Sequence, residues 1–224
     1  MIEGGRGSGK TMFIKYHCHN TRFSKKRDSI TADELKHVGL YFRPDTDFSA
    51  MINKFNFGDE WEKVFKHYIS LGILEDFANS LVSIANTTFE DISFSASPLS
   101  CETPISLRDA IKGFPEYFEG LVGFQKNALA KFNLWLNDIE SFEKPPFFEP
   151  RTILSQLIDQ LQLFAPELKE LCFYVYFDEF ENLTEDQQRV LNNWMKHGKQ
   201  PLIFNAAYLS LIHISEPTRP RSIS

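Results

Sequence analysis

Eight residues near the start of the chain read Gly4-Gly5-Arg6-Gly7-Ser8-Gly9-Lys10-Thr11 and match the phosphate-binding pattern G-x-x-x-x-G-K-[ST], known as Walker A. Glycines let a backbone wrap closely around a phosphate chain, and the helix that follows offers its positive N-terminus to the anion. In this pattern Lys10 reaches the β- and γ-phosphates, and the hydroxyl of Thr11 ligates Mg²⁺. We therefore expect the stretch to bind a nucleotide. The alternative is a glycine-rich turn before a helix.

A pair of carboxylates, Asp178-Glu179, follows the apolar run 171–177, an arrangement known as Walker B. Ligands of parallel sheets bind at the carboxyl ends of the strands, so Asp178 is expected to face the phosphate loop and hold Mg²⁺. Glu179 is expected to act as the general base that polarises the attacking water. The alternative is that both acids only cap the next helix.

A polar residue, Asn205, lies near the end of the strand expected after Asp178-Glu179. We expect it to sense the γ-phosphate and to orient the water. An ordinary strand asparagine is an equal alternative.

The Asp-Glu tandem also separates reaction classes. One carboxylate is neutralised by the metal and the other stays available as a base. This fits a hydrolase that carries its own glutamate base better than a GTPase or a small-molecule kinase. The chain contains no Asn-Lys-x-Asp motif, which reads guanine, so ATP is favoured over GTP. A nucleoside or small-molecule kinase is kept as a third hypothesis.

Composition excludes several other classes. The chain has 224 residues, 42% of them hydrophobic, and its 22 phenylalanines predict a phenylalanine-rich globular core. A net charge of −6 provides no overall basic surface for nucleic acid. Three scattered cysteines favour a reduced, cytoplasmic protein. No apolar stretch approaches the roughly 18 residues that a membrane span needs, so no membrane partner is expected.

Strands and helices alternate in the elements that must position these residues. The expected strands cover 37–42, 171–177 and 201–207, and the expected helices cover 10–19, 59–85, 105–120, 122–141, 150–164 and 184–197. This order predicts an α/β fold of the P-loop NTPase type, with a mainly parallel sheet sandwiched by helices. Residues 44–170 are expected to form a large, mostly helical insert between strands 2 and 3. In the first helix, Met12, Phe13 and Tyr16 are expected to form the apolar face.

Both ends of the chain have unusual sequence. Only three residues precede Gly4, fewer than the five or so of a typical strand, so most of the first strand is expected to be missing. The stretch from Leu209 to Arg219 resembles one reading frame of a transposase-type sequencing adapter. We therefore expect a P-loop ATPase domain over 1–208, incomplete at both ends, and a non-native tail over 209–224. The alternative is a natural extension.

Three segments together carry a family resemblance: residues 2–11, residues 38–43 and residues 176–183. They resemble prokaryotic ATPases of the AAA+ superfamily related to the origin-recognition (initiator) clade. The resemblance implies a five-stranded parallel sheet between helices, with Asp178 as the Walker B acid and Glu179 as the catalytic glutamate. It also implies that Asn205 is sensor 1, the residue that senses the γ-phosphate. For the complete parent protein it leaves open a homo-oligomer and a DNA or protein partner. The family's arginine finger, second sensor and helical lid are not found in this sequence.

Two functions from different classes follow. The first is an ATPase module that binds ATP, hydrolyses it with Mg²⁺ and couples nucleotide state to conformational change. The second is an ATP-gated scaffold with negligible turnover, which recruits a partner through its helical insert.

The adapter resemblance makes a prediction about the gene. Amplifying the locus from source DNA is expected to give a different sequence after about Tyr208. Recovering Leu209 to Ser224 intact would contradict the adapter interpretation.

Overall fold

One parallel sheet organises the part of the chain that the computed structural model describes, which is residues 2–4 and 9–209. Its strands run in the order β1-β4-β3-β2. They are β1 (Ile2–Gly4), β2 (Val38–Phe42), β3 (Phe173–Phe177) and β4 (Leu202–Leu209). Every pairing is parallel, and Phe177 of β3 lies level with Phe42 on one side and Ala206 on the other. The carboxyl ends of β2 and β3 therefore meet at one edge of the sheet.

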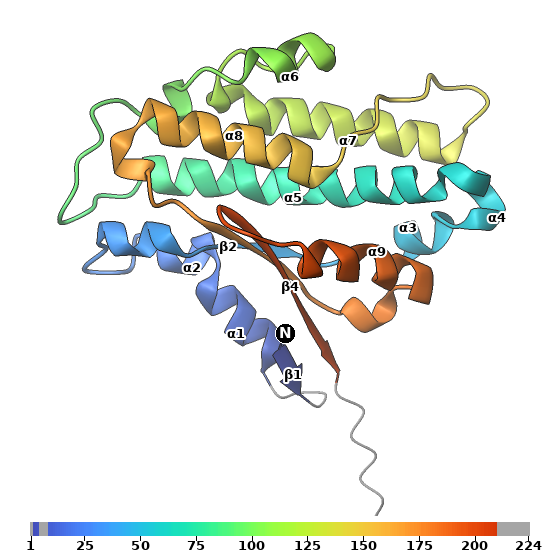
Figure 1. Cartoon of the computed structure of the whole chain (residues 1–224), viewed down its shortest axis with the longest axis horizontal. Helices are drawn as coiled ribbons and strands as arrows, with labels where there is room; N and C mark the ends of the chain where they lie inside the picture. The colour runs from blue at the N-terminus through green and yellow to red at the C-terminus, as the bar shows by residue number, and fades with distance from the viewer. Residues whose placement is uncertain (1, 5–8, 210–224) are drawn as a thin grey trace, which may run out of the picture.

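Helices cover both faces of this sheet, which confirms the predicted α/β class. Figure 1 shows α5 running along one face with α7 and α8 beyond it, while α1 leads away from β1. The helices are α1 (Lys10–His17), α2 (His19–Arg22), α3 (Thr46–Met51), α4 (Lys54–Phe57), α5 (Trp61–Ala85), α6 (Ile105–Ala110), α7 (Leu121–Asn137), α8 (Pro150–Phe164) and α9 (Glu185–Lys196).

Side chains alternate between the two faces along each central strand, as the two-residue period of a strand requires. In β3, Phe173, Val175 and Phe177 enter the large core shared with α5, α8 and α9. Tyr176 lies on the opposite face and packs with Ile14 of α1. Both faces of β3 are therefore covered, and the continuous apolar run predicted this correctly.

The longest helix, α5, forms the centre of the core. Its buried residues lie all around the helix, because the sheet, α7 and α8 each contact a different side. Gly72 does not break the helix, although glycine lowers helix propensity. The ring of Phe42 packs where a side chain at Gly72 would stand, so the small residue lets β2 approach closely.

The predicted apolar face of the first helix is wrong. Met12, Phe13 and Tyr16 are 73%, 53% and 67% exposed, whereas Ile14 is fully buried. The helix turns Ile14, and four residues later Cys18, towards the sheet, so the other three side chains point away from it.

Residues 43–172, between β2 and β3, form α3 to α8 and the connections among them. The helix expected over 105–120 is wrong beyond Ala110, because the backbone becomes extended at Ile111. It then turns at Gly113, whose φ is 80°. That this region is an insertion relative to a simpler fold stays a prediction. Residues 210–224 of the expected tail lie outside the described residues.

Among the helices that the structure describes, none combines the length and the apolar character needed to cross a membrane.

The contact between β2 and the end of α1 makes a prediction about stability. A Cβ at Gly39 would collide with the backbone carbonyl of His17, which cannot move independently of the chain. We expect Gly39→Ala to lower the free energy of unfolding by about 1–3 kcal/mol, as overpacking does. Gly123→Ala is the matched control, because no atom lies within 4 Å of the added methyl. Equal stability of the two variants in urea unfolding would contradict the assigned contact.

Candidate functional site

The N-terminus of α1 lies where the predicted phosphate loop ends. Gly9 precedes the helix with φ 81°, a left-handed conformation that glycine adopts without strain. Its N-cap residue, Gly9, has no side chain with which to cap the helix, and the first turn of α1 contains no acidic residue. Its N-terminal amides and the positive end of its dipole therefore suit an anion. Lys10 is the first residue of α1, and Gly4 ends β1. The remaining predicted phosphate contacts, Gly5, Arg6, Gly7 and Ser8, lie outside the described residues.

The carboxylate of Asp178 joins α1 to the sheet. Asp178 follows β3 directly and is 3% exposed. The Thr11 hydroxyl donates to its Oδ2 at 2.8 Å. The Tyr41 hydroxyl donates to the same oxygen at 2.9 Å, and the backbone N–H of Glu179 donates to Oδ1 at 3.0 Å. The two residues predicted to hold the metal, Thr11 and Asp178, are thus in direct contact.

The tyrosine was not predicted from the sequence. Burial and the hydrogen bond to Asp178 both raise the pKa of Tyr41 above its ordinary value, so its hydroxyl stays protonated and remains a donor. The strand pattern offers a partial signal. Tyr41 precedes the last residue of β2, beside β3, and both strands end at the edge where Asp178 lies.

Glu179 points to a different partner. Its backbone has φ 53° and ψ 37°, the left-handed region that non-glycine residues rarely adopt. Arg43 contacts its Oε2 through both Nε and a terminal nitrogen at 2.8 Å, and the Asn182 side chain donates to that oxygen at 3.0 Å. The left-handed turn therefore separates the two acids: Asp178 faces α1, and Glu179 faces Arg43. Sequence reasoning missed Arg43, although it follows β2 as directly as Asp178 follows β3.

Asn205 lies level with Tyr41, one residue before the ends of β2 and β3. It pairs with Tyr176, two residues before Asp178, and β4 continues beyond it to Leu209. Its role at the γ-phosphate stays a prediction.

The donor set suits Mg²⁺ bound together with a nucleotide. No group of three or more His, Cys, Asp or Glu side chains in the described part of the chain could hold a metal by itself. Mg²⁺ is usually held by one or two protein oxygens while phosphates and water complete its shell. A threonine hydroxyl and one buried carboxylate, beside the N-terminus of α1, match that requirement.

A comparison with protein families identifies the group to which the chain is related. The family model described as ORC-CDC6-like matches residues 1–222. The chain belongs to the ORC-CDC6-like family. The resemblance to AAA+ ATPases of the origin-recognition clade is thereby confirmed, and the family supports a general ATPase-related role. Searches of curated proteins and of solved structures gave no match.

The left-handed backbone at Glu179 makes a prediction that separates strain from ion pairing. Glu179→Ala and Glu179→Gly both remove the contact with Arg43. The difference between their free energies of unfolding therefore isolates the contribution of the backbone conformation. We expect the glycine variant to be more stable by about 1 kcal/mol in urea unfolding, because alanine pays the left-handed strain and glycine does not. In an ordinary helix or strand the order is the reverse, and finding that usual order would contradict the assigned conformation.

Proposed function

We propose that this ORC-CDC6-like chain is an AAA+ type ATPase module that binds ATP and hydrolyses it with Mg²⁺, coupling nucleotide state to conformational change. The observation that carries the proposal is the 2.8 Å hydrogen bond from Thr11 to Asp178. It joins Thr11, the last residue of the Walker A pattern, to Asp178, the first acid of the Walker B pattern, which lies 167 residues further along the chain. The contact lies in the first turn of α1. A glycine-rich turn or a helix-capping acid pair by itself would give no reason for that contact.

Each residue then has a defined task. Lys10 contacts the β- and γ-phosphates, and the backbone from Gly4 to Gly9 surrounds them. Thr11 and Asp178 hold Mg²⁺, which when bound neutralises charge that develops on the phosphates. Glu179 accepts a proton from the attacking water, and Asn205 orients that water.

The second candidate, an ATP-gated scaffold with negligible turnover, is favoured by one observation. Glu179 is held by Arg43 and Asn182 rather than directed at the site beside Thr11. A base in that position has to leave an ion pair before it can act. If the ion pair persists with ATP bound, the protein binds nucleotide without hydrolysing it. The region between β2 and β3 would then recruit the partner.

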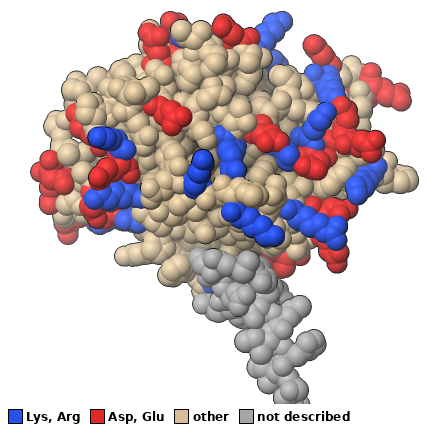
Figure 2. All heavy atoms as spheres, viewed as in Figure 1, with Lys and Arg blue, Asp and Glu red and all other residues tan. Residues whose placement is uncertain are grey.

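Surface charge and the state of the cysteines bear on the partners and the cellular location of the protein. On the face seen in Figure 2, basic and acidic side chains are interspersed, which is not the single-sign surface of a general nucleic-acid binder. A DNA or protein partner stays a prediction, and a homo-oligomer is compatible with the family. The buried thiols of Cys18, Cys101 and Cys172 are unpaired, which supports a reducing, cytoplasmic location.

Loss of the loop lysine tests nucleotide binding. We expect Lys10→Ala to weaken Mg²⁺-ATP binding by roughly 100-fold in calorimetry, because an ammonium contact to phosphate is lost. Lys126→Ala, at an exposed position of α7, is the control and should bind as the wild type does. Retained affinity in the Lys10 variant would refute the phosphate-loop assignment.

Replacing the proposed base separates the two candidates. Under the ATPase proposal, Glu179→Gln abolishes phosphate release and keeps ATP binding, because the amide cannot take a proton. Under the scaffold alternative the wild type already shows negligible turnover, so the substitution changes little. Transfer of phosphate to an added nucleoside would instead support the kinase hypothesis.

A further inference from the structure

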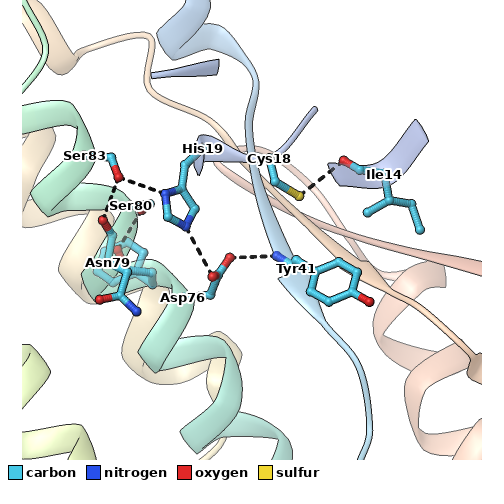
Figure 3. A network of polar contacts seen from close by, with 9 residues as sticks. Ile14, Cys18, His19, Tyr41, Asp76, Asn79, Ser80 and Ser83 are labelled. Carbon is cyan, nitrogen blue, oxygen red and sulfur yellow. Dashed lines mark hydrogen bonds and ion pairs between the residues drawn. The ribbon is translucent and has the colours of Figure 1, made fainter. Parts of the chain in front are cut away.

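A buried polar network lies behind the candidate site, and Figure 3 shows it between α5 and β2. His19 of α2 is 1% exposed. Its ring nitrogens contact Ser83 Oγ at 3.0 Å and Asp76 Oδ1 at 3.2 Å, and both of these partners belong to α5. The other oxygen of Asp76 accepts the backbone N–H of Tyr41 at 2.7 Å. One carboxylate thus links two helices to β2.

The Asp76 carboxylate provides a hydrogen-bond acceptor for the edge strand β2. Among the described strands β2 is an edge strand beside β3, and alternate residues of β2 direct their backbone groups away from β3. Gly39, one of these residues, forms an isolated parallel bridge with Cys18. The carbonyl of Phe42 points towards β3 and accepts a hydrogen bond from the backbone N–H of Asp178, which directly follows that strand. Tyr41, one residue earlier, directs its N–H outward to Asp76. The backbone of Tyr41 is therefore fixed from the helical side of the molecule.

The side chain of the same residue reaches the site. The Tyr41 hydroxyl donates to Asp178 Oδ2, the oxygen that also accepts from Thr11. Two donors on one oxygen, together with the Glu179 N–H on the other, fix the rotation of the carboxylate. Tyr41 thus has its backbone held by Asp76 and its hydroxyl on the acid that faces α1.

We propose that Tyr41 is a positioning residue for the metal site, which holds Asp178 in its metal-binding orientation and is itself held by Asp76 and His19. This inference rests on the proposed function and adds a residue to it. It also makes α5 part of the support of the metal site, because the Asp76 side chain comes from that helix. A change in α5 would therefore alter metal affinity without contact with the nucleotide.

The test uses Mn²⁺ as a probe of the Mg²⁺ position. Binding of Mn²⁺ to the chain with ADP is followed by electron paramagnetic resonance, and ADP binding in EDTA is measured separately. We expect Tyr41→Phe to weaken Mn²⁺ binding by roughly tenfold, since a hydrogen bond to a charged group is lost, with metal-free ADP affinity unchanged. Asp76→Ala is expected to weaken Mn²⁺ binding as well, with a lower unfolding temperature.

Two further variants make the outcome decisive. Tyr117→Phe, a partly exposed tyrosine outside the network, is the matched control and should bind Mn²⁺ normally. Asp178→Asn sets the scale. If Asp178→Asn weakens Mn²⁺ binding and Tyr41→Phe does not, the positioning role is refuted while the proposed function stands. If Asp178→Asn also has no effect, the proposed function itself fails. Equal loss of ADP affinity with and without metal in Tyr41→Phe would show a merely structural role.

Discussion

A buried carboxylate that needs donors from several elements is the constraint on which the rest of this structure depends. Asp178 is 3% exposed, and a charge so far from water is costly unless it is hydrogen-bonded. The donors come from α1, from β2 and from the chain just after β3. Satisfying Asp178 therefore fixes the position of α1 against the sheet, at the edge where parallel sheets bind their ligands.

The core explains why this edge can be held firmly. The strands beside Asp178 bury phenylalanines on one face, where α5 runs along the sheet, and tyrosines near α1 on the other. The tyrosine face is the one whose side chains form hydrogen bonds, because a tyrosine combines an apolar ring with a hydroxyl that needs a partner when it is buried. Tyr41 finds Asp178, and Tyr176 finds the imidazole of His37 at 2.6 Å. Tyr41 and Tyr176 thus contribute both apolar packing and hydrogen bonds.

The sequence predicted what depends on local pattern. The buried strand before Asp178 and the helices α5 and α9 all depend on neighbours in the chain, and all are confirmed. The sequence did not predict features that depend on how distant segments of the chain pack together. Met12, Phe13 and Tyr16 had helical spacing, yet spacing cannot say which side of α1 meets the sheet. Tyr41 and Arg43 were missed as site residues because their partners are 137 and 136 residues away. Their position next to the end of a strand beside Walker B was the available signal.

If Thr11 and Asp178 act together on a metal-bound nucleotide, their effects on its affinity depend on each other. A double-mutant cycle with Thr11→Val and Asp178→Asn measures this dependence, with ATP affinity determined in Mg²⁺ and again in EDTA. In Mg²⁺ we expect each single variant to lose most of the metal-dependent affinity and the double variant to lose little more, a coupling of at least about 1 kcal/mol that disappears in EDTA. Additive losses in Mg²⁺, or the same coupling without metal, would contradict it.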